Sequence, residues 1–306
     1  MVFTVHEHTA EIGGLPIFWR SAQGGGTPTL YLHGVPSSSD DWVAPREHRA
    51  VRPWIRRWWR RERAGDRWTV PPPLQTGFLE RSGGVAVDLP GFGRSGKPGD
   101  LGYTMGEYGA FVERFLDHLA IERVKLVVHD WGAVGLVWAQ ANPQRVERLV
   151  ITNAVPLLGG YRWHRTARLW RTPGLGELAM GASSRGVLRR ATRTANATGP
   201  LPEAFIDSIV AHFDEGTRRA ILRLYRSSPP AALERAGVDL ERVDAPALVV
   251  WGAQDPYIPL RFGREYARRL PHAQLIELDG AGHWWWFDRP QAIERVVEFL
   301  ADGGGE

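Results

Sequence analysis

The feature that most constrains the fold is the alternation of short apolar runs with helical patterns along most of the chain. The runs are four to six residues long and end at small or polar residues, as buried strands do. Alternation of this kind is typical of a mostly parallel sheet with helices on both faces. After an N-terminal hairpin at about 3–21, we expect strands at 29–32, 84–88, 124–129, 149–152, 247–252 and 273–278.

The alternation is interrupted once, between about 156 and 235. No strand-like run occurs there, and the pattern is helical and rich in arginine and tryptophan. Because the two ends of an insertion must lie close together, we expect a helical cap over the carboxyl edge of the strands. The expected domains are therefore a core of residues 1–155 and 236–306 and a cap of residues 156–235.

A second unusual stretch lies at about 44–80, where a short connection would suffice. Its apolar residues repeat on one helical face, with arginines opposite: Trp54, Ile55, Trp58 and Trp59. A basic amphipathic helix at 51–63 could contact a membrane surface. We favour a lid helix packed on the cap, because that surface already needs covering.

The composition bounds the function. Net charge is +4, but the surplus is local, with nine arginines between Arg46 and Arg67 and another cluster from Arg162 to Arg193. No nucleic-acid-binding module accompanies these clusters, so we expect no nucleic-acid partner. The chain has no cysteine, which excludes disulfides and thiol catalysis. With no secretory signal and no apolar run near the ~20 residues of a membrane span, we expect a cytoplasmic protein.

A turn at the end of one expected strand places Asp130 where a helix begins. Strand 124–129 is followed by Asp130-Trp131-Gly132-Ala133, and small residues just after the apex permit a sharp strand–turn–helix elbow. Such an elbow exposes the apex side chain above the sheet and aims backbone N–H groups at the helix start. An aspartate before a helix is also a common N-cap, so other strand ends must decide.

Three other strand ends carry complementary groups. His33-Gly34-Val35-Pro36 follows the first buried strand, where a second oxyanion donor would arise. Asp255 follows strand 247–252, and His283 follows strand 273–278. Together with Asp130 they give the chain order nucleophile, acid, base that this architecture requires.

We therefore predict that Asp130 is a covalent nucleophile, that His283 is the base and that Asp255 orients it. The backbone N–H groups of Val35 and Trp131 would form the oxyanion hole. A carboxylate can displace a leaving group at a saturated carbon, and the absence of any Gly-x-Ser-x-Gly motif disfavours a serine esterase. The expected reactants are a small apolar organic molecule and water, without a metal or cofactor.

These motifs resemble the α/β-hydrolase superfamily, in its epoxide hydrolase and haloalkane dehalogenase branch. The likeness covers nearly all of the chain except about 44–80 and much of the cap. It implies an α/β-hydrolase fold, with a mostly parallel eight-stranded sheet and an inserted helical cap, and a hydrolase that works through an alkyl-enzyme ester. The matching segments are HGVP (33–36), DLPGFGRSGKP (88–98), HDWG (129–132), WGAQDP (251–256) and GAGHW (280–284).

The resemblance also bears on the acid. Many dehalogenases place it after the strand that ends here near Thr152, but this chain has Asn153 there. Asp255 therefore has the strongest positional claim. Asp279 and Asp288 flank the histidine, with weaker claims.

An epoxide hydrolase needs proton donors in the cap. Tyr225-Arg226 resembles the Tyr-Arg pair that epoxide hydrolases carry there, and Tyr161 and His164 are candidates for a second donor. The alternative for Tyr225 is a tyrosine simply packed in a helix.

A haloalkane dehalogenase instead needs two N–H donors for the halide. Trp131 stands where dehalogenases place the first, but Val35 replaces the usual asparagine. A cap tryptophan, Trp163 or Trp170, would have to serve. We predict an epoxide hydrolase, with a haloalkane dehalogenase, or another hydrolase acting on esters, as the alternative.

Overall fold

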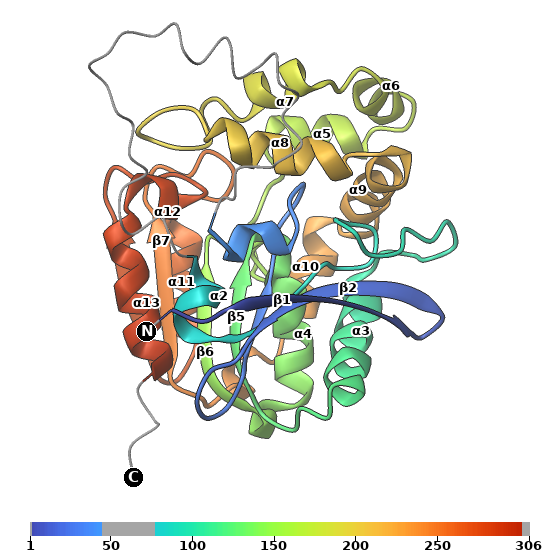
Figure 1. Cartoon of the computed structure of the whole chain (residues 1–306). Helices are drawn as coiled ribbons and strands as arrows, with labels where there is room; N and C mark the ends of the chain where they lie inside the picture. The colour runs from blue at the N-terminus through green and yellow to red at the C-terminus, as the bar shows by residue number, and fades with distance from the viewer. Residues whose placement is uncertain (1, 45–76, 302–306) are drawn as a thin grey trace, which may run out of the picture.

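A computed structural model describes residues 2–44 and 77–301. The helix predicted at 51–63 and most of the 44–80 insertion lie outside the described residues. The centre of the fold is one eight-stranded sheet of order β1-β2-β4-β3-β5-β6-β7-β8 (Figure 1). Its strands are β1 (Val5–Ile12), β2 (Leu15–Ala22), β3 (Thr29–Leu32), β4 (Gly84–Val87), β5 (Val124–His129), β6 (Val146–Thr152), β7 (Ala247–Gly252) and β8 (Ala273–Leu278).

The sheet is mostly parallel, as predicted. The hairpin β1–β2 is antiparallel, and β2 pairs antiparallel with β4. All pairs from β4 to β8 are parallel, so the carboxyl ends of six strands meet at one edge. The predicted strands are confirmed, although β6 begins at Val146 rather than Leu149 and its pairing with β5 shifts register near Val124.

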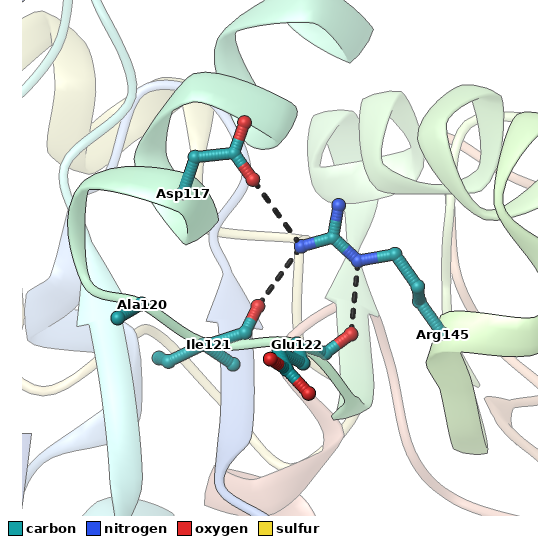
Figure 2. Close-up of a pocket in the computed structure, with 5 residues that line it drawn as sticks. All are labelled: Asp117, Ala120, Ile121, Glu122 and Arg145. Atoms are coloured by element: carbon teal, nitrogen blue, oxygen red, sulfur yellow. Dashed lines mark hydrogen bonds and ion pairs between the residues drawn. The ribbon is translucent and has the colours of Figure 1, made fainter.

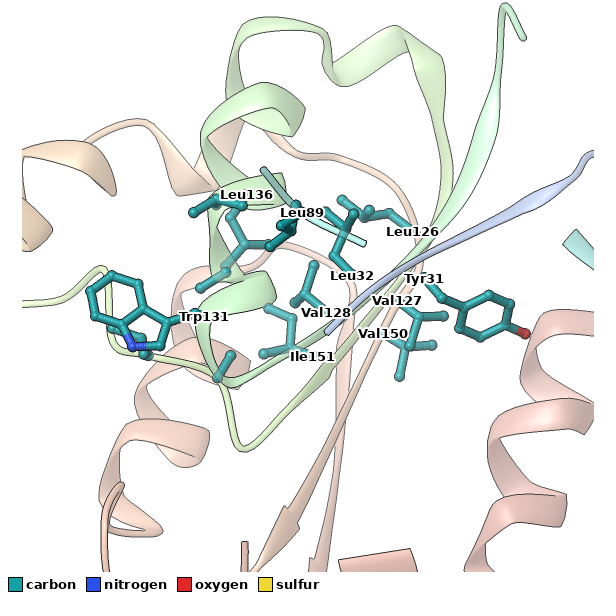
Figure 3. Close-up of a cluster of buried hydrophobic side chains, with 14 of the residues drawn as sticks. Tyr31, Leu32, Leu89, Leu126, Val127, Val128, Trp131, Leu136, Val150 and Ile151 are labelled. Carbon is teal, nitrogen blue, oxygen red and sulfur yellow. The ribbon is translucent and has the colours of Figure 1, made fainter. Parts of the chain in front are cut away.

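Helices cover both faces of the sheet. Leu32, Leu126 and Val128 pack closely around Gly135 of α4, whereas the Tyr31 hydroxyl bonds Ser82 of α2 on the opposite face. Figure 3 shows Tyr31 on the other side of the central strands from Leu32, Leu126 and Val128. Burying each aliphatic side chain contributes on the order of 2 kcal/mol. The core helices are α2 (Phe78–Ser82), α3 (Met105–His118), α4 (Val134–Ala141), α11 (Arg261–Arg269), α12 (Trp285–Asp288) and α13 (Ile293–Ala301).

The segment between β6 and β7 is helical, and we call it the helical insertion. Figure 1 shows α5 to α9 grouped together at one end of the sheet. None of the helices in the described part of the chain is long and apolar enough to cross a bilayer. The helices of the insertion are α5 (Arg165–Arg171), α6 (Leu175–Gly181), α7 (Arg185–Ala191), α8 (Glu203–His212), α9 (Glu215–Ser227) and α10 (Pro230–Ala236).

Helix α9 attaches the helical insertion to the loop after β4. The Thr217 hydroxyl donates to the carbonyl of Gly91 at 3.2 Å. Two arginines of the same helix reach further along that loop: Arg219 donates to the Lys97 carbonyl at 2.9 Å, and Arg223 to the Leu101 carbonyl at 3.0 Å. These bonds run from side chains to backbone, so they fix the position of α9 against the core.

Candidate active site

The elbow predicted after β5 is present. The chain turns from β5 into a short 3-10 helix, Asp130–Ala133, and then into α4. Asp130 has a backbone φ of +47°, in the left-handed region that residues other than glycine rarely adopt. A Cβ atom at Gly132 would lie 2.1 Å from the Leu32 carbonyl oxygen, so only glycine fits there. The turn holds the Asp130 carboxylate above the carboxyl edge of the sheet.

The Asp130 carboxylate is buried and held by the loop after β3. The backbone N–H of Val35 donates to Asp130 Oδ2 at 2.8 Å. Burial raises the pKa of Asp130 to about 6, with the charge of Asp255 acting in the same direction. The charge of His283 and the backbone N–H groups of Val35 and Trp131 oppose this raise. The two predicted oxyanion donors therefore both act on Asp130.

His283 and Asp255 meet as the sequence suggested. His283 Nδ1 donates to Asp255 Oδ2 at 2.7 Å, so the unprotonated Nε2 of a neutral ring faces Asp130 Oδ1, 4.0 Å away. Burial alone would lower the pKa of His283, but the charge of Asp255 and its hydrogen bond, then the charges of Asp130 and Asp41, raise it above its ordinary value. His283 is thus electrostatically linked to Asp130.

Asn153 is a member of this cluster that the sequence analysis noted only for lacking a carboxylate. Its side-chain N–H donates at 2.6 Å to Asp255 Oδ2, the same oxygen that His283 bonds. Its Oδ1 accepts the backbone N–H of Gly252 at 2.9 Å. Since Asp255 Oδ1 accepts two further backbone N–H groups at 2.7 and 3.0 Å, both oxygens of Asp255 are fixed.

Aromatic rings enclose the imidazole of His283. The rings of His129, Trp284 and Tyr257 have centroids 4.6, 4.6 and 5.1 Å from it. His129 Nδ1 bonds the Thr152 carbonyl at 3.0 Å, and burial, reinforced by His283, lowers the pKa of His129 well below its ordinary value. His129 therefore stays neutral beside His283, which its sequence motif did not indicate.

Tyr225 lies inside a box of tryptophans above the elbow. Its ring is 4.9 Å from those of Trp131 and Trp163 and 5.1 Å from that of Trp170. Burial raises the pKa of Tyr225 well above its ordinary value, and the charge of Asp130 adds to the raise, while the indole of Trp131 opposes it. The buried Nε1 of Trp131 completes no hydrogen bond with a described residue. The helical insertion thus brings Tyr225 to the elbow.

The other two predicted donors lie in the same region. The Tyr161 hydroxyl is buried without a hydrogen-bond partner among the described residues, and burial, then the charges of Asp130 and Asp255, raise its pKa. His164 caps α5, its Nδ1 accepting the Ala167 backbone N–H at 3.4 Å. The proton of the neutral ring is therefore on Nε2, and burial lowers the pKa of His164 to about 4.

Two predicted neighbours are engaged elsewhere. The indole N–H of Trp163 donates to the Ser228 carbonyl at 3.1 Å, so this tryptophan is bound to backbone rather than free to hold a halide. Arg226, of the Tyr-Arg pair, forms a 2.6 Å ion pair with Glu177 of α6. It joins two helices of the insertion rather than reaching the elbow.

A third buried carboxyl group, Asp41, lies in the 3-10 helix Ser39–Trp42, which follows the loop that carries Val35. Its Oδ2 is 2.6 Å from the Ser37 hydroxyl, which also lies 3.1 Å from the Gly34 carbonyl, and its Oδ1 has no partner among the described atoms. Burial raises the pKa of Asp41 to about 8, and the charges of Asp40 and Asp130 contribute. The sequence analysis did not single out Asp41.

The pocket in Figure 2 belongs to the opposite edge of the sheet. It is lined by Asp117, Ile121, Glu122 and Arg145, between the end of α3 and the start of β6. Arg145 bonds the carbonyls of Ile121 and Glu122, each at 2.9 Å. Because parallel strands begin here, this pocket lies away from the triad, and its arginine is already saturated.

Comparisons with known proteins identify the family of this chain. The alpha/beta hydrolase fold family matches residues 27–290. The cis-3-alkyl-4-alkyloxetan-2-one decarboxylase of Xanthomonas campestris pv. campestris is 30% identical over 255 residues, which cover 73% of this chain and 81% of that protein.

Solved structures agree as well. Haloalkane dehalogenase DbeA from Bradyrhizobium elkani superposes with a TM-score of 0.74 at 25% identity, covering 97% of this chain and 98% of that one. The epoxide hydrolase CorEH gives a TM-score of 0.74 at 22% identity, covering 97% and 99%, a likeness of fold alone. The chain belongs to the α/β-hydrolase fold family of enzymes.

Proposed function

We propose that this enzyme hydrolyses epoxides through a covalent ester on Asp130. The observation that carries the proposal is that the two carboxylate oxygens of Asp130 have different neighbours. Oδ2 accepts the Val35 backbone N–H at 2.8 Å, whereas Oδ1 accepts no backbone N–H from a described residue and lies 4.0 Å from His283 Nε2. Oδ1 is the oxygen suited to attack, and Oδ2 is already at the oxyanion hole.

In the first step Asp130 Oδ1 attacks one epoxide carbon. The carbon–oxygen bond of the ring breaks, its electron pair goes to the departing oxygen, and a proton donor must neutralise that oxygen. The product is a hydroxyalkyl ester of Asp130. Only ionised Asp130 attacks, so this step speeds up as the pH rises through the pKa of about 6.

In the second step His283 Nε2 takes a proton from water, which attacks Asp130 Cγ. Charge develops on Oδ2 between the N–H groups of Val35 and Trp131. When this intermediate collapses, the bond between Cγ and the ester oxygen breaks, and the leaving alkoxide takes the proton held by His283 to give the diol. The remaining proton of the water returns to the group that gave one up in ring opening. Esterification removes the charge of Asp130, one of the charges that raise the pKa of His283. The pKa of the base therefore falls when the ester forms, which favours the neutral imidazole that this step needs.

Tyr225 and Tyr161 are the donors that the site supports best for ring opening. Both are buried, and the charge of Asp130 affects the pKa of each hydroxyl. The Tyr161 hydroxyl lacks a partner among the described residues, which leaves it available to the substrate oxygen. His164 Nε2 is a neutral third donor in the same region, and the helical insertion would serve as the cap that brings all three together.

Haloalkane hydrolysis is the second candidate, favoured by the indole N–H of Trp131, which has no hydrogen-bond partner among the described residues. A leaving halide needs a second N–H donor as well. Val35 has no side-chain donor, and the Trp163 indole is bound to the Ser228 carbonyl. Trp170, half-buried against Tyr225, is the remaining tryptophan that the sequence suggested.

A substrate panel on three proteins separates the candidates. Epoxides, haloalkanes, p-nitrophenyl esters and a 3,4-dialkyl oxetan-2-one, the substrate type of one relative, are assayed with wild type, Tyr225→Phe and Trp131→Phe. We expect epoxide turnover in the wild type and its loss, by about 100-fold or more, in Tyr225→Phe. Halide release that needs Trp131 and not Tyr225 would replace this proposal with the dehalogenase.

A further inference from the structure

Asp288 receives four hydrogen bonds from two segments far apart in the chain. Its Oδ2 accepts the backbone N–H groups of Gly282 at 2.8 Å and Ala197 at 3.0 Å. Its Oδ1 accepts the backbone N–H of Thr198 at 2.9 Å and also the Thr198 hydroxyl. An ionised carboxylate has acceptor sites for about four donors, and the side chain is 7% exposed. The carboxylate is thus fully used in joining the two segments.

The segment beside Asp288 comes from the helical insertion and touches the loop of the base. The backbone N–H of His283 itself donates to the Ala195 carbonyl at 2.7 Å. The Asn196 side chain donates to the Trp284 carbonyl at 3.2 Å. A Cβ atom at Gly282 would lie 2.1 Å from the Ala195 carbonyl oxygen, so the two backbones are in direct contact.

We propose that Asp288 is a positioning residue that fastens residues 195–198 of the helical insertion to the loop carrying His283, so that the catalytic base is held in place only when the insertion is docked. The proposal rests on the two-step reaction above and assigns Asp288 a positioning role in its second step, hydrolysis of the ester. Asp288 does not reach the reacting atoms, and it acts through the backbone on either side of the imidazole.

The bonds explain why this device should affect the base more than the nucleophile. Asp130 is held by the elbow and by Val35, which belong to the core and make no bond to residues 195–198. The His283 loop, in contrast, has N–H groups of two consecutive residues, Gly282 and His283, directed to Asp288 and Ala195. Removing the carboxylate leaves buried donors unpaired and frees this loop.

Asp288→Asn tests the idea with little change of shape. An amide offers one acceptor oxygen and turns its own N–H groups toward N–H donors, so bonds on one side are lost. In single-turnover mixing followed by mass analysis, we expect the ester on Asp130 to form within about threefold of the wild-type rate and to hydrolyse about 10- to 100-fold more slowly. Asp279→Asn is the matched control, because it removes an exposed carboxylate close to the same loop and should change neither rate.

Hydrogen exchange gives a readout that does not depend on ester chemistry. In Asp288→Asn the amides of Gly282, His283, Ala197 and Thr198 should exchange faster, while those of β5 keep their protection and show that the core is intact. If Asp288→Asn loses the β5 protection, Thr198→Val, which removes one hydroxyl donor and leaves the carboxylate, should give the same pattern with a smaller effect.

The outcomes separate the two proposals. An ester that hydrolyses at the wild-type rate in Asp288→Asn, with unchanged exchange in the His283 loop, overturns the fastening role. Equal slowing of ester formation and hydrolysis also overturns it, because that is the result of a general loss of structure. Absence of any ester in the wild type and in His283→Gln would instead refute the two-step reaction, and the exchange result would still decide whether Asp288 joins the segments.

Discussion

The sheet edge and the helical insertion supply the site in different ways. Asp130, Asp255 and His283 each follow the end of a strand, and backbone or side-chain N–H groups fix both oxygens of the acid and one oxygen of the nucleophile. Tyr225 and Tyr161 are placed by rings packing on rings. The first arrangement fixes charge and direction, and the second fixes shape. Loss of the base at the edge should therefore stop hydrolysis of the ester, whereas loss of a phenol of the insertion should slow ring opening and leave ester hydrolysis unchanged.

The largest expected effect separates the two chemical steps at the edge. His283→Gln removes the base, so the ester on Asp130 should accumulate and its hydrolysis should fall about 10⁴-fold or more. Intact-protein mass after adding substrate should show an increase equal to the substrate. His272→Gln, an exposed histidine before β8, is the control and should accumulate nothing; normal turnover in His283→Gln would contradict the assignment of the base.

The insertion is tested next, through its phenols. Tyr225→Phe and Tyr161→Phe each remove one donor, and we expect epoxide opening to slow by about 10²- to 10³-fold in each, with hydrolysis of a preformed ester unchanged. Rapid-quench measurement of ester formation checks this. Tyr103→Phe, whose hydroxyl bonds the Pro98 carbonyl in the core, should leave the rate as it is. If neither insertion variant slows ring opening, the donors come from elsewhere.

A smaller effect is expected at Asn153, which belongs to the edge although it is not a charged group. Asn153→Gly removes the N–H bonded to Asp255 and keeps a residue that accepts φ +40°, so ester hydrolysis should slow about 10- to 100-fold. Asn153→Ala loses the same bond but strains the backbone. Equal rates with a lower Tm in the alanine variant would assign the rate loss to the amide; unchanged hydrolysis in both would show that Asp255 needs no such support.

The smallest expected effect is a pH dependence of the protein's stability that arises from the ionisation of Asp41. Because the pKa of folded Asp41 is raised to about 8, the folded protein binds its proton more tightly than the unfolded chain, and the free energy of unfolding falls as the pH rises from about 4 to 8. Asp41→Asn cannot ionise, so its Tm relative to wild type should increase by a few degrees between pH 5 and pH 9.

Asp40 is a control of opposite sign for Asp41. Burial favours its neutral form, but Arg20 and Arg94 outweigh burial and lower the pKa of Asp40. Its ionised form therefore stabilises the protein above acid pH, and this contribution is lost as the pH falls through the folded pKa. Asp40→Asn should cost most Tm at neutral pH. If Asp41→Asn shows the same trend as Asp40→Asn, Asp41 is ionised in the folded protein.

The site residues at the sheet edge were easier to predict from the sequence than those of the insertion. The ends of strands can be predicted from the sequence, because a buried strand is a short apolar run and residues that follow parallel strands lie at one edge of the sheet. Asp130, Asp255, His283 and Val35 were predicted in this way. Asn153 follows a predicted strand, but an amide is neither an acid nor a nucleophile, so the sequence did not indicate a role for it. Its bond to Asp255 is visible only in the structure. Asp288 was given a weaker positional claim as the acid, and its bonds to residues 197 and 198 could not be predicted because those residues lie in another part of the chain.

The insertion was less predictable for a physical reason. Helical periodicity shows which residues share a face but not which element that face packs against. Tyr225 was identified by resemblance, and the commitment of the Trp163 indole to the Ser228 carbonyl has no sequence signal. The same holds for Arg226, which pairs with Glu177 rather than serving the site.

The most direct test of the central claim follows one oxygen atom. A single turnover with enzyme in excess is run in water enriched in ¹⁸O, and the peptide containing Asp130 and the product are weighed by mass spectrometry. We predict that the heavy oxygen enters the carboxyl group of Asp130 and that the new product hydroxyl carries the light oxygen of the enzyme. Heavy oxygen in the product with none in that peptide would mean that water attacks the substrate directly, and the covalent mechanism would be wrong.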